Sequence, residues 1–473
     1  MSLGGMAVML LGVLFRRRTP VAVGACLTIV AAALSLWAVG PSREAVFSGL
    51  VTLDAFSGVF RWLVLGVTGL VVLMAWRASD VEEGWTGELL GLILLVGVGL
   101  MLMAQSTHLL MMVVAIELVS LGSYCLVALT RDARSSEAGL KYLLFGALSS
   151  GIMLFGISLL YGLTGELGFS SLNAALARLG PAGVRAAPVA AALVLAGLAF
   201  KISMVPFHMW TPDVYEGAPI AVAALLSVGP KAAGLALLVR LSQAIGPVWV
   251  SLQPVIMLLA VLTMTLGNVV ALLQTNVKRL LAYSTIGQVG YLLIGFAVGT
   301  RVGLEAILVY LVAYLFMNLG AFACVAAVHR ETGDPARPEF QGAGGESLEA
   351  FRGLAGRAPA LALSFAIFLL SLAGIPPLVG FIGKFLLFGA AIEAKYPWLA
   401  VAGAINSAIA LYYYVNLLRL MYLHSPDGPD RGRGTGWSLR VALGICGVAT
   451  VWLGLFPGTL LAWVRVVVAS NLL

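Results

Sequence analysis

The sequence predicts an all-α polytopic membrane protein with about 14 transmembrane helices, since each crossing of a bilayer needs about 20 apolar residues. Of its 473 residues, 61% are hydrophobic and only 10% are charged. The apolar residues come in long runs separated by short loops, and a few of these runs contain lysine or proline. No soluble domain is indicated, so the whole chain is assigned to the membrane.

The expected helices follow one another along the chain. The first run is short for a span, and Arg16, Arg17 and Arg18 follow it instead of preceding it, which argues against a signal peptide. The expected spans are Gly4–Phe15, Pro20–Gly40, Phe56–Trp76, Leu89–Gln105, His108–Thr130, Leu140–Leu163, Ala186–Pro206, Ile220–Leu241, Leu252–Gln274, Leu281–Gly299, Val302–Val328, Pro359–Ala391, Trp398–Leu423 and Val441–Leu461.

Basic residues predict the orientation of these spans. The loops on the side reached after the first helix hold 16 lysines and arginines, and the opposite loops hold seven. Loops that face the cytoplasm carry the excess of basic residues. We therefore expect the more basic side, which includes the loop from His329 to Ala358, to be cytoplasmic and both termini to lie outside.

Two groups of five helices form a weak internal repeat. Residues 86–245 hold expected helices four to eight and residues 246–425 hold helices nine to thirteen, while residues 1–85 and 426–473 flank them. An odd number of spans in each group turns the second group upside down relative to the first, as in many transporters. The fourth helix of each group carries a lysine and a proline break: Lys201 with Pro206, and Lys384 with Pro376 and Pro377.

The segment KISMVPFHMWTPDVYEGAP, from Lys201 to Pro219, has the features of an ion pathway. A lysine near mid-membrane costs about 2.5 to 3.5 kcal/mol on insertion scales and is rare unless it faces a partner, a cavity or water. Pro206 favours a broken helix, which membranes tolerate only where protein or water satisfies the freed backbone groups. The alternative is a lysine that snorkels to the interface from a helix that ends at the proline.

Glu117, in MMVVAIELVSLGSY, is about ten residues from either end of its expected helix and too deep to snorkel. A close pair with a lysine would keep both groups charged. At about 8 Å and an effective dielectric near 20, Glu117 and Lys201 would interact by about 2 kcal/mol, comparable to moving one charge through about 100 mV. The pair is therefore a candidate for loading and unloading a proton, and a static ion pair is the alternative.

Three further residues are candidates for the pathway. Lys231 lies in the helix that ends the first group, directly after Gly229 and Pro230. His208 could relay protons near neutral pH or brace the broken helix. Lys141, about one turn into its helix, could admit protons or snorkel to the interface.

Charged residues near helix ends are assigned structural roles. Lys278 and Arg279 are interpreted as loop charges that set the orientation, and Arg240 as an interfacial residue. Asp213 and Glu216 are expected to fix the loop after the broken helix through capping or charge contacts.

The sequence contains no signature of a bound metal or redox cofactor. The four cysteines are scattered through apolar runs, and CxxC, GxGxxG and Walker motifs are absent from the sequence. Basic residues are spread over many short loops, so the net charge of +7 does not indicate nucleic-acid binding. Any redox chemistry or nucleotide energy must come from another chain.

Over nearly its whole length, the sequence resembles the antiporter-like membrane subunits of the proton-pumping NADH:quinone oxidoreductase, respiratory complex I, and among them the N type. The most specific pieces are AIELVSL, FKISMVPFHMWTPDVYEGAP, QTNVKRLLAYSTI, SLAGIPPLVGFIGKF and ALYYYVNLL. The segment WTPDVYEGAP and the lysine at position 384 both favour the N type.

The resemblance implies roles for four residues. Position by position, the family's glutamate of helix five and lysines of helices seven, eight and twelve correspond to Glu117, Lys201, Lys231 and Lys384. The resemblance implies a half-channel around Lys201, a connection through Lys231 and a second half-channel around Lys384.

One position departs from the family. Relatives commonly have a histidine in the tenth helix, where this chain reads STIGQVGY with Gln288. A glutamine cannot carry a proton through its own titration. We predict that water held by Tyr283, Gln288 and Tyr291 bridges Lys231 and Lys384 instead.

We therefore expect a proton-translocating subunit, driven by redox chemistry elsewhere, in the bacterial cytoplasmic (inner) membrane. The resemblance implies no cofactor in this chain, and it places NADH, flavin, iron–sulfur clusters and quinone in partner subunits. Sister antiporter-like subunits and other membrane and peripheral subunits are the expected neighbours. The alternatives are a subunit of a multisubunit cation/proton antiporter, which shares the fold, and a structural membrane subunit with a degenerate channel.

Overall fold

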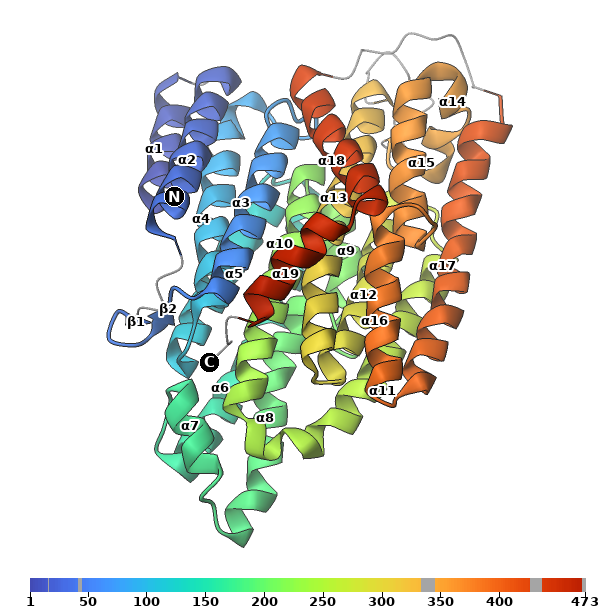
Figure 1. Cartoon of the computed structure of the whole chain (residues 1–473). Helices are drawn as coiled ribbons and strands as arrows, with labels where there is room; N and C mark the ends of the chain where they lie inside the picture. Colours follow the sequence, from blue (N-terminus) through green and yellow to red (C-terminus); the bar gives the residue numbers. More distant parts are fainter. Residues whose placement is uncertain (16, 41–44, 333–344, 426–435, 470–473) are drawn as a thin grey trace.

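The computed structural model describes the chain except residues 16, 41–44, 333–344, 426–435 and 470–473. Most helices lie side by side in one bundle (Figure 1). The helices are α1 (Ser2–Phe15), α2 (Arg18–Val39), α3 (Ala55–Ala75), α4 (Thr86–Gln105), α5 (Leu109–Val127), α6 (Ala133–Thr164), α7 (Phe169–Leu176), α8 (Pro181–Ile202), α9 (Trp210–Gly217), α10 (Ile220–Ala244), α11 (Gly246–Ala271), α12 (Val277–Ala297), α13 (Arg301–Thr332), α14 (Leu354–Arg357), α15 (Pro359–Ala373), α16 (Val379–Glu393), α17 (Pro397–Leu423), α18 (Trp437–Leu455) and α19 (Gly458–Ala469). Short 3-10 turns are η1 (Glu83–Trp85) and η3 (Leu348–Phe351), and β1 (Ala45–Val46) pairs antiparallel with β2 (Val51–Thr52).

The predicted all-α polytopic class is confirmed. Among the described residues, 12 helices are long and apolar enough to cross a membrane. The remaining expected spans are α1, which is shorter than a full crossing, and the range Pro359–Ala391, which is divided between α15 and α16. Since α15 and α16 have 15 residues each, neither reaches across a bilayer alone.

Both predicted helix breaks are present. The α8 helix ends at Ile202, four residues before Pro206, and Ser203 takes a left-handed conformation with φ 64°. The second break separates α15 from α16 and begins at Gly374, where φ is 89°. A third break was not predicted: the expected span Val441–Leu461 is divided between α18 and α19 just before Pro457, which cannot continue a helix.

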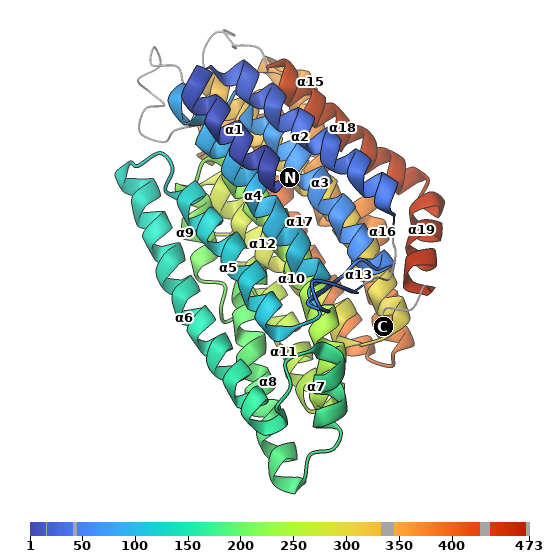
Figure 2. The same ribbon diagram turned by 90° about the vertical axis from the view of Figure 1, so that its left-hand side faces the viewer.

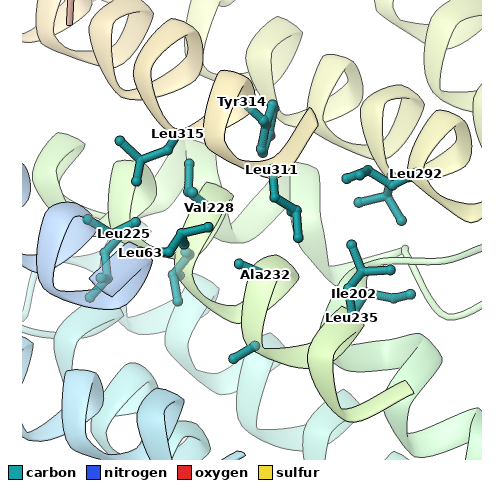
Figure 3. Packing of buried hydrophobic residues seen from close by; sticks show 14 of the residues in the cluster. Leu63, Ile202, Leu225, Val228, Ala232, Leu235, Leu292, Leu311, Tyr314 and Leu315 are labelled. Carbon is teal, nitrogen blue, oxygen red and sulfur yellow. The ribbon is translucent and has the colours of Figure 1, made fainter. Parts of the chain in front are cut away.

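Three helices form the centre of the bundle, α10, α12 and α13 (Figure 1). In the most apolar stretch of each, all of α10, 94% of α12 and 83% of α13 are buried. Leu63 of α3, Val228 of α10 and Leu315 of α13 lie near one another in this core (Figure 3). Gly234 lets α10 pass close to α8, because a Cβ there would lie 2.4 Å from the Cγ2 of Ile202. The helix that carries Lys231 is therefore packed at the centre.

The outer helices expose apolar side chains. The α6 helix runs along one edge of the molecule (Figure 2), and it exposes Leu144, Leu148 and Phe155. Large exposed apolar faces are suited to lipid or to a neighbouring membrane subunit.

The interpretation of Arg240 as an interfacial residue is wrong. Its side chain is buried, Nη2 lies 2.8 Å from both carboxylate oxygens of Asp54, and Nε donates to the carbonyl of Ala104 at 2.8 Å. Asp54 also accepts from the backbone nitrogen of Ser57 at 2.7 Å and so caps the start of α3. Because the two residues are 186 positions apart in the sequence, no local pattern indicates that they pair.

The inverted relation of residues 86–245 and 246–425 stays a prediction, and so do those boundaries. Four of the basic residues behind the expected orientation lie outside the described residues: Arg16, Arg337, Arg431 and Arg433.

Candidate functional site

The first broken helix buries Lys201 completely at its end. The backbone nitrogens of Ser203 and Met204 turn back onto the carbonyls of Phe200 and Ala199, so the α8 helix closes directly after this lysine. Lys201 Nζ donates to Ser120 Oγ of α5 at 3.0 Å, and Ser120 Oγ donates to Ile116 O at 2.8 Å. The ammonium therefore has a neutral hydroxyl as its direct partner.

Glu117 lies on α5 one turn before Ser120 and is half-buried. Its carboxylate accepts from Ser150 Oγ of α6 at 2.5 Å. Glu117 and Lys201, both described, form no direct ion pair. The structure thus places Glu117 on the same helix as Ser120, the residue that Lys201 of α8 contacts.

Lys231 is fully buried in α10, one residue after Pro230. No atom of the described residues accepts a hydrogen bond from its Nζ. Instead, Nζ lies 4.7 Å from the ring centre of Trp210 and 5.3 Å from that of Tyr215, both in α9. Such rings attract a cation through their negative faces. The short helix after the first break thus covers the lysine of the next span.

Trp210 joins the two halves of the broken helix. Its Nε1 donates to Phe200 O of α8 at 3.0 Å, and its ring stacks on Tyr142 of α6 with centres 4.4 Å apart. The carbonyl of Phe200 lies in the last turn of α8, where an α-helix leaves its carbonyls without a partner in the helix. The indole therefore gives the Phe200 carbonyl a second hydrogen bond, beside that from Ser203 N, while its ring faces Lys231.

Lys384 occupies the second break in a related way. It is buried in α16, and its Nζ donates to Ala373 O, the last residue of α15, at 3.1 Å. The same Nζ lies 4.3 Å from the ring centre of Tyr291. The carboxyl end of a helix carries partial negative charge, which favours a cation at this place.

Gln288 is held by protein groups on both sides of its amide. Nε2 donates to Leu372 O at 3.1 Å and to Tyr414 Oη at 3.4 Å, and Oε1 accepts from Tyr310 Oη. Neither Tyr283 nor Tyr291 is hydrogen-bonded to this amide in the described structure. The direct partners of Gln288 are thus the end of α15 and tyrosines from α13 and α17, and the water bridge through Tyr283, Gln288 and Tyr291 stays a prediction.

A row of buried hydroxyl and amide groups continues from Gln288. Ser284 and Tyr414 hydroxyls lie 2.5 Å apart, and Tyr314 Oη donates to Thr285 Oγ1 at 3.0 Å. On the other side, Asn268 Nδ2 donates to Tyr291 Oη at 3.0 Å. Gln288 and Tyr291 place these groups beside the second break, because Gln288 bonds the end of α15 and Tyr291 lies against Lys384.

Sequence reasoning missed Tyr310, Tyr314 and Tyr414. The pair Tyr310 and Tyr314, four residues apart in an apolar run, places two hydroxyls on one helix face. Tyr414 lies in a run of three tyrosines within the motif ALYYYVNLL, which likewise indicates several hydroxyls on one helix. The contacts of Tyr310 and Tyr414 with Gln288, and of Tyr314 with Thr285, depend on packing between helices more than 20 residues apart in sequence, which no local pattern indicates.

The remaining relay candidates differ in their surroundings. His208 is buried between α8 and α9, its Nδ1 has no partner among the described residues, and its carbonyl accepts from Thr211 N at 2.9 Å. Lys141 is 40% exposed, and its Nζ pairs with Glu137 at 2.7 Å and with Asp213 at 3.1 Å. His208 thus faces the break, whereas Lys141 belongs to an ion-pair cluster at a helix end.

No metal or disulfide site emerges from the described part of the chain. No group of three or more histidine, cysteine, aspartate or glutamate side chains there could hold a metal ion. The thiols of Cys26, Cys125, Cys324 and Cys446 are all free.

Comparison with protein families gives one match, to the NADH:quinone oxidoreductase/Mrp antiporter transmembrane family over residues 106–410. NADH-quinone oxidoreductase subunit N of Anaeromyxobacter sp. (strain Fw109-5) is 39% identical over 98% of this chain and 94% of its own length. NADH-quinone oxidoreductase subunit N 2 of Sorangium cellulosum (strain So ce56) is 47% identical over 88% of this chain and 84% of its own.

Solved structures agree with this likeness. A chain in respiratory complex I from Thermus thermophilus with bound aureothin is 33% identical, with a TM-score of 0.81 over 98% of this chain and 99% of that one. A chain of the Mrp complex from Dietzia sp. DQ12-45-1b has a TM-score of 0.82 at 24% identity, covering 99% and 95% of the two chains. The second likeness extends to the fold alone.

Proposed function

This chain belongs to the NADH:quinone oxidoreductase/Mrp antiporter family of transmembrane subunits, and from that premise we infer that it works as subunit N of a proton-pumping NADH:quinone oxidoreductase. Relatives that cover nearly the whole chain carry that name. The chain is one subunit among others in such a complex, as its likeness to a chain of an assembled respiratory complex I indicates. NADH, flavin, iron–sulfur clusters and quinone belong to the partner subunits in this proposal.

The observation that carries a proton-translocating role is the set of three buried lysines at the two helix breaks and between them. Lys201, Lys231 and Lys384 are each at most 3% exposed. Ionisable groups inside a membrane are costly and mark ion pathways or proton relays. The proposed route runs from Lys201 through Lys231 to Lys384.

The partners of the three lysines differ in a way that suits transfer. Lys201 has the hydroxyl of Ser120 as its acceptor, and Lys231 has only the faces of two rings. Lys384 has the carbonyl of Ala373 at the negative end of a helix. Since Lys231 lacks a hydrogen-bond acceptor among the described residues, a proton there is held least firmly and passes on to either neighbour.

Glu117 acts in this scheme as the charge that biases Lys201. Glu117 of α5 is one turn from Ser120, the partner of Lys201, but is not bonded to the lysine, so its influence is electrostatic and can be changed without breaking a contact. Moving one charge across about 100 mV requires about 2.3 kcal/mol. The electrostatic interaction between Glu117 and Lys201 must change by about this free energy if it is to move a proton against such a potential.

The membrane is proposed to be the bacterial cytoplasmic (inner) membrane, with both termini outside. The count of 16 basic residues against seven in the two sets of loops supports this orientation.

Co-purification tests the proposed function. A tagged form of the chain should bring down NADH-oxidising subunits that contain iron–sulfur clusters, and deletion of the chain should abolish NADH-driven proton pumping in membrane vesicles. A tagged chain that instead brings down only membrane subunits, with cation/proton exchange intact in the absence of NADH, would favour the antiporter alternative.

A further inference from the structure

The short helix α9 separates the buried Lys231 from a cluster of ion pairs. Two pairs of residues on α9 point to different partners: the rings of Trp210 and Tyr215 form what we call its aromatic side, and the carboxylates of Asp213 and Glu216, about 60° apart around the helix, form its acidic side. The aromatic side faces Lys231, as described above. The acidic side is about one third exposed.

Arg279 binds both acidic residues of α9. Its Nη1 lies 2.7 Å from Asp213 Oδ1 and 2.9 Å from Glu216 Oε2. Arg279 is in the first turn of α12, one of the central helices, and its backbone nitrogen is capped by the side chain of Asn276 at 3.2 Å. One guanidinium nitrogen, Nη1, thus binds two points of α9 to a rigid element.

Lys278 holds the end of the same short helix. Its buried Nζ donates to the carbonyl of Ala218, which ends α9, at 2.7 Å. The same Nζ pairs with Glu346 of the loop after α13 at 2.8 Å. Arg134 of α6 completes the cluster with contacts to Glu216 at 3.1 Å and Glu346 at 3.0 Å. Adjacent residues of α12 therefore secure α9 along its acidic side and at its end.

Such external contacts matter because α9 is short. A helix of eight residues does not hold its place by its own hydrogen bonds, and it depends on packing and charge contacts. On its inner side the rings of Trp210 and Tyr215 are the direct surroundings of the Lys231 ammonium. A shift of α9 by a fraction of an ångström changes those surroundings, because a cation–π contact weakens as the ring moves away.

We propose that Arg279 is a positioning residue for proton transfer through Lys231: it holds α9, through Asp213 and Glu216, so that Trp210 and Tyr215 keep their places against the Lys231 ammonium. The inference rests on the proposed function, since it assumes that protons pass through Lys231. Arg279 does not touch Lys231, and it acts only through α9.

The test compares Arg279→Gln with Arg77→Gln in the full complex, in vesicles, per assembled complex. Arg77 is an exposed arginine at the end of α3 that forms no ion pair among the described residues. Arg279→Gln should lower NADH-driven pumping by about threefold to tenfold and move the alkaline limb of its pH profile to lower pH, since displaced rings favour the charged lysine less. Arg77→Gln should change neither.

Two further variants separate positioning from mere stability. Arg279→Lys keeps the charge but loses the planar guanidinium, so it should retain part of the activity and show a smaller pH shift than Arg279→Gln, and it serves as the test if the glutamine variant assembles poorly. Asp213→Asn combined with Glu216→Gln should move the pH profile in the same direction as Arg279→Gln and at least as far, because it also removes the contacts to Lys141 and Arg134. Adding Arg279→Gln to that pair should cost nothing more.

The outcomes for the two proposals are distinct. If Lys231→Ala pumps normally, the route through Lys231 fails, whatever Arg279 does. If Lys231→Ala stops pumping while Arg279→Gln keeps the activity and pH profile of Arg77→Gln, only the positioning role fails. A lower amount of assembled complex with an unmoved pH profile in both Arg279 variants would also overturn it.

Discussion

Gln288 and Lys384 donate to neighbouring carbonyl oxygens of one helix end: Gln288 Nε2 to Leu372 O and Lys384 Nζ to Ala373 O, each at 3.1 Å. Both carbonyls belong to the last residues of α15, whose continuation is broken at Gly374. Gln288 therefore fixes the helix end that receives the lysine of the second half-channel. This role needs no titration of the glutamine itself.

Replacing Gln288 by leucine should slow coupled turnover. The substitution leaves the carbonyl of Leu372 and the hydroxyl of Tyr310 without this partner, and an unsatisfied buried polar group costs about 1 to 3 kcal/mol. Histidine offers both a donor and an acceptor and should be tolerated. NADH-driven pumping of the two variants in vesicles is the measurement, and equal activity of the leucine and wild-type proteins would remove Gln288 from the pathway.

Glu117 and Lys201 should show coupled effects although they do not touch. Lys201→Ala removes the charge that Glu117 acts upon, so adding Glu117→Gln on that background should cost little more. Glu117→Asp keeps the charge and should retain part of the activity. Pumping of both single variants, the double variant and Glu117→Asp, with assembly checked in each, gives the coupling free energy. Losses that simply add would show that the two residues act independently.

The sequence predicted the architecture well because the membrane imposes one pattern on every span. Apolar runs located the helices, and the prolines near Lys201 and Lys384 located both breaks. The third break, before Pro457, was not predicted, because the apolar run Val441–Leu461 was assigned to one helix although it contains this proline. The ends of helices were predicted less accurately, as α8 begins five residues before the expected Ala186.

The sequence predicted which charged residues belong to the candidate site, but it did not predict which side chains they contact. Four buried or half-buried charged residues were named from depth and resemblance, and the structure confirms the burial of the three lysines. Their partners, such as Ser120 for Lys201 and the α9 rings for Lys231, come from other helices. Partner choice depends on helix packing, which composition and periodicity do not encode.

Labelling from outside should leave a cysteine at position 347 unmodified. Ser347 lies in the loop expected to be cytoplasmic, paired with Asn276 at the start of α12. In a background with the exposed Cys125 replaced by serine, a membrane-impermeant maleimide should react with a cysteine at exposed Lys395 and not with one at Ser347. The reverse pattern would invert the proposed topology.

The contribution of Glu346 to stability should be lost in acid. Burial raises the pKa of its carboxyl, but the charge and hydrogen bond of Lys278 and the charges of Arg134 and His329 outweigh burial and hold the pKa below its ordinary value of 4.5. A lowered pKa in the folded state stabilises the protein above the ordinary value, and this stabilisation disappears as pH falls below it.

The measurement is the thermal midpoint of the purified complex for wild type and Glu346→Gln. Wild type should have the higher midpoint at neutral pH, and the difference should narrow as pH falls through about 4.5 and below. A difference that stays constant over this range would show that the charge of Glu346 does not contribute.

The central claim is that protons pass through Lys231, and Lys231→Ala tests it most directly. Proton pumping and coupled quinone reduction are measured in vesicles, beside Lys395→Ala as a control at an exposed lysine. We expect the Lys231 variant to insert and assemble while pumping falls by at least about tenfold, since a lost proton relay cannot be replaced by a methyl group. The Lys395 variant should pump normally. An assembled Lys231→Ala complex with normal pumping would contradict the account and leave Lys231 as a packing residue.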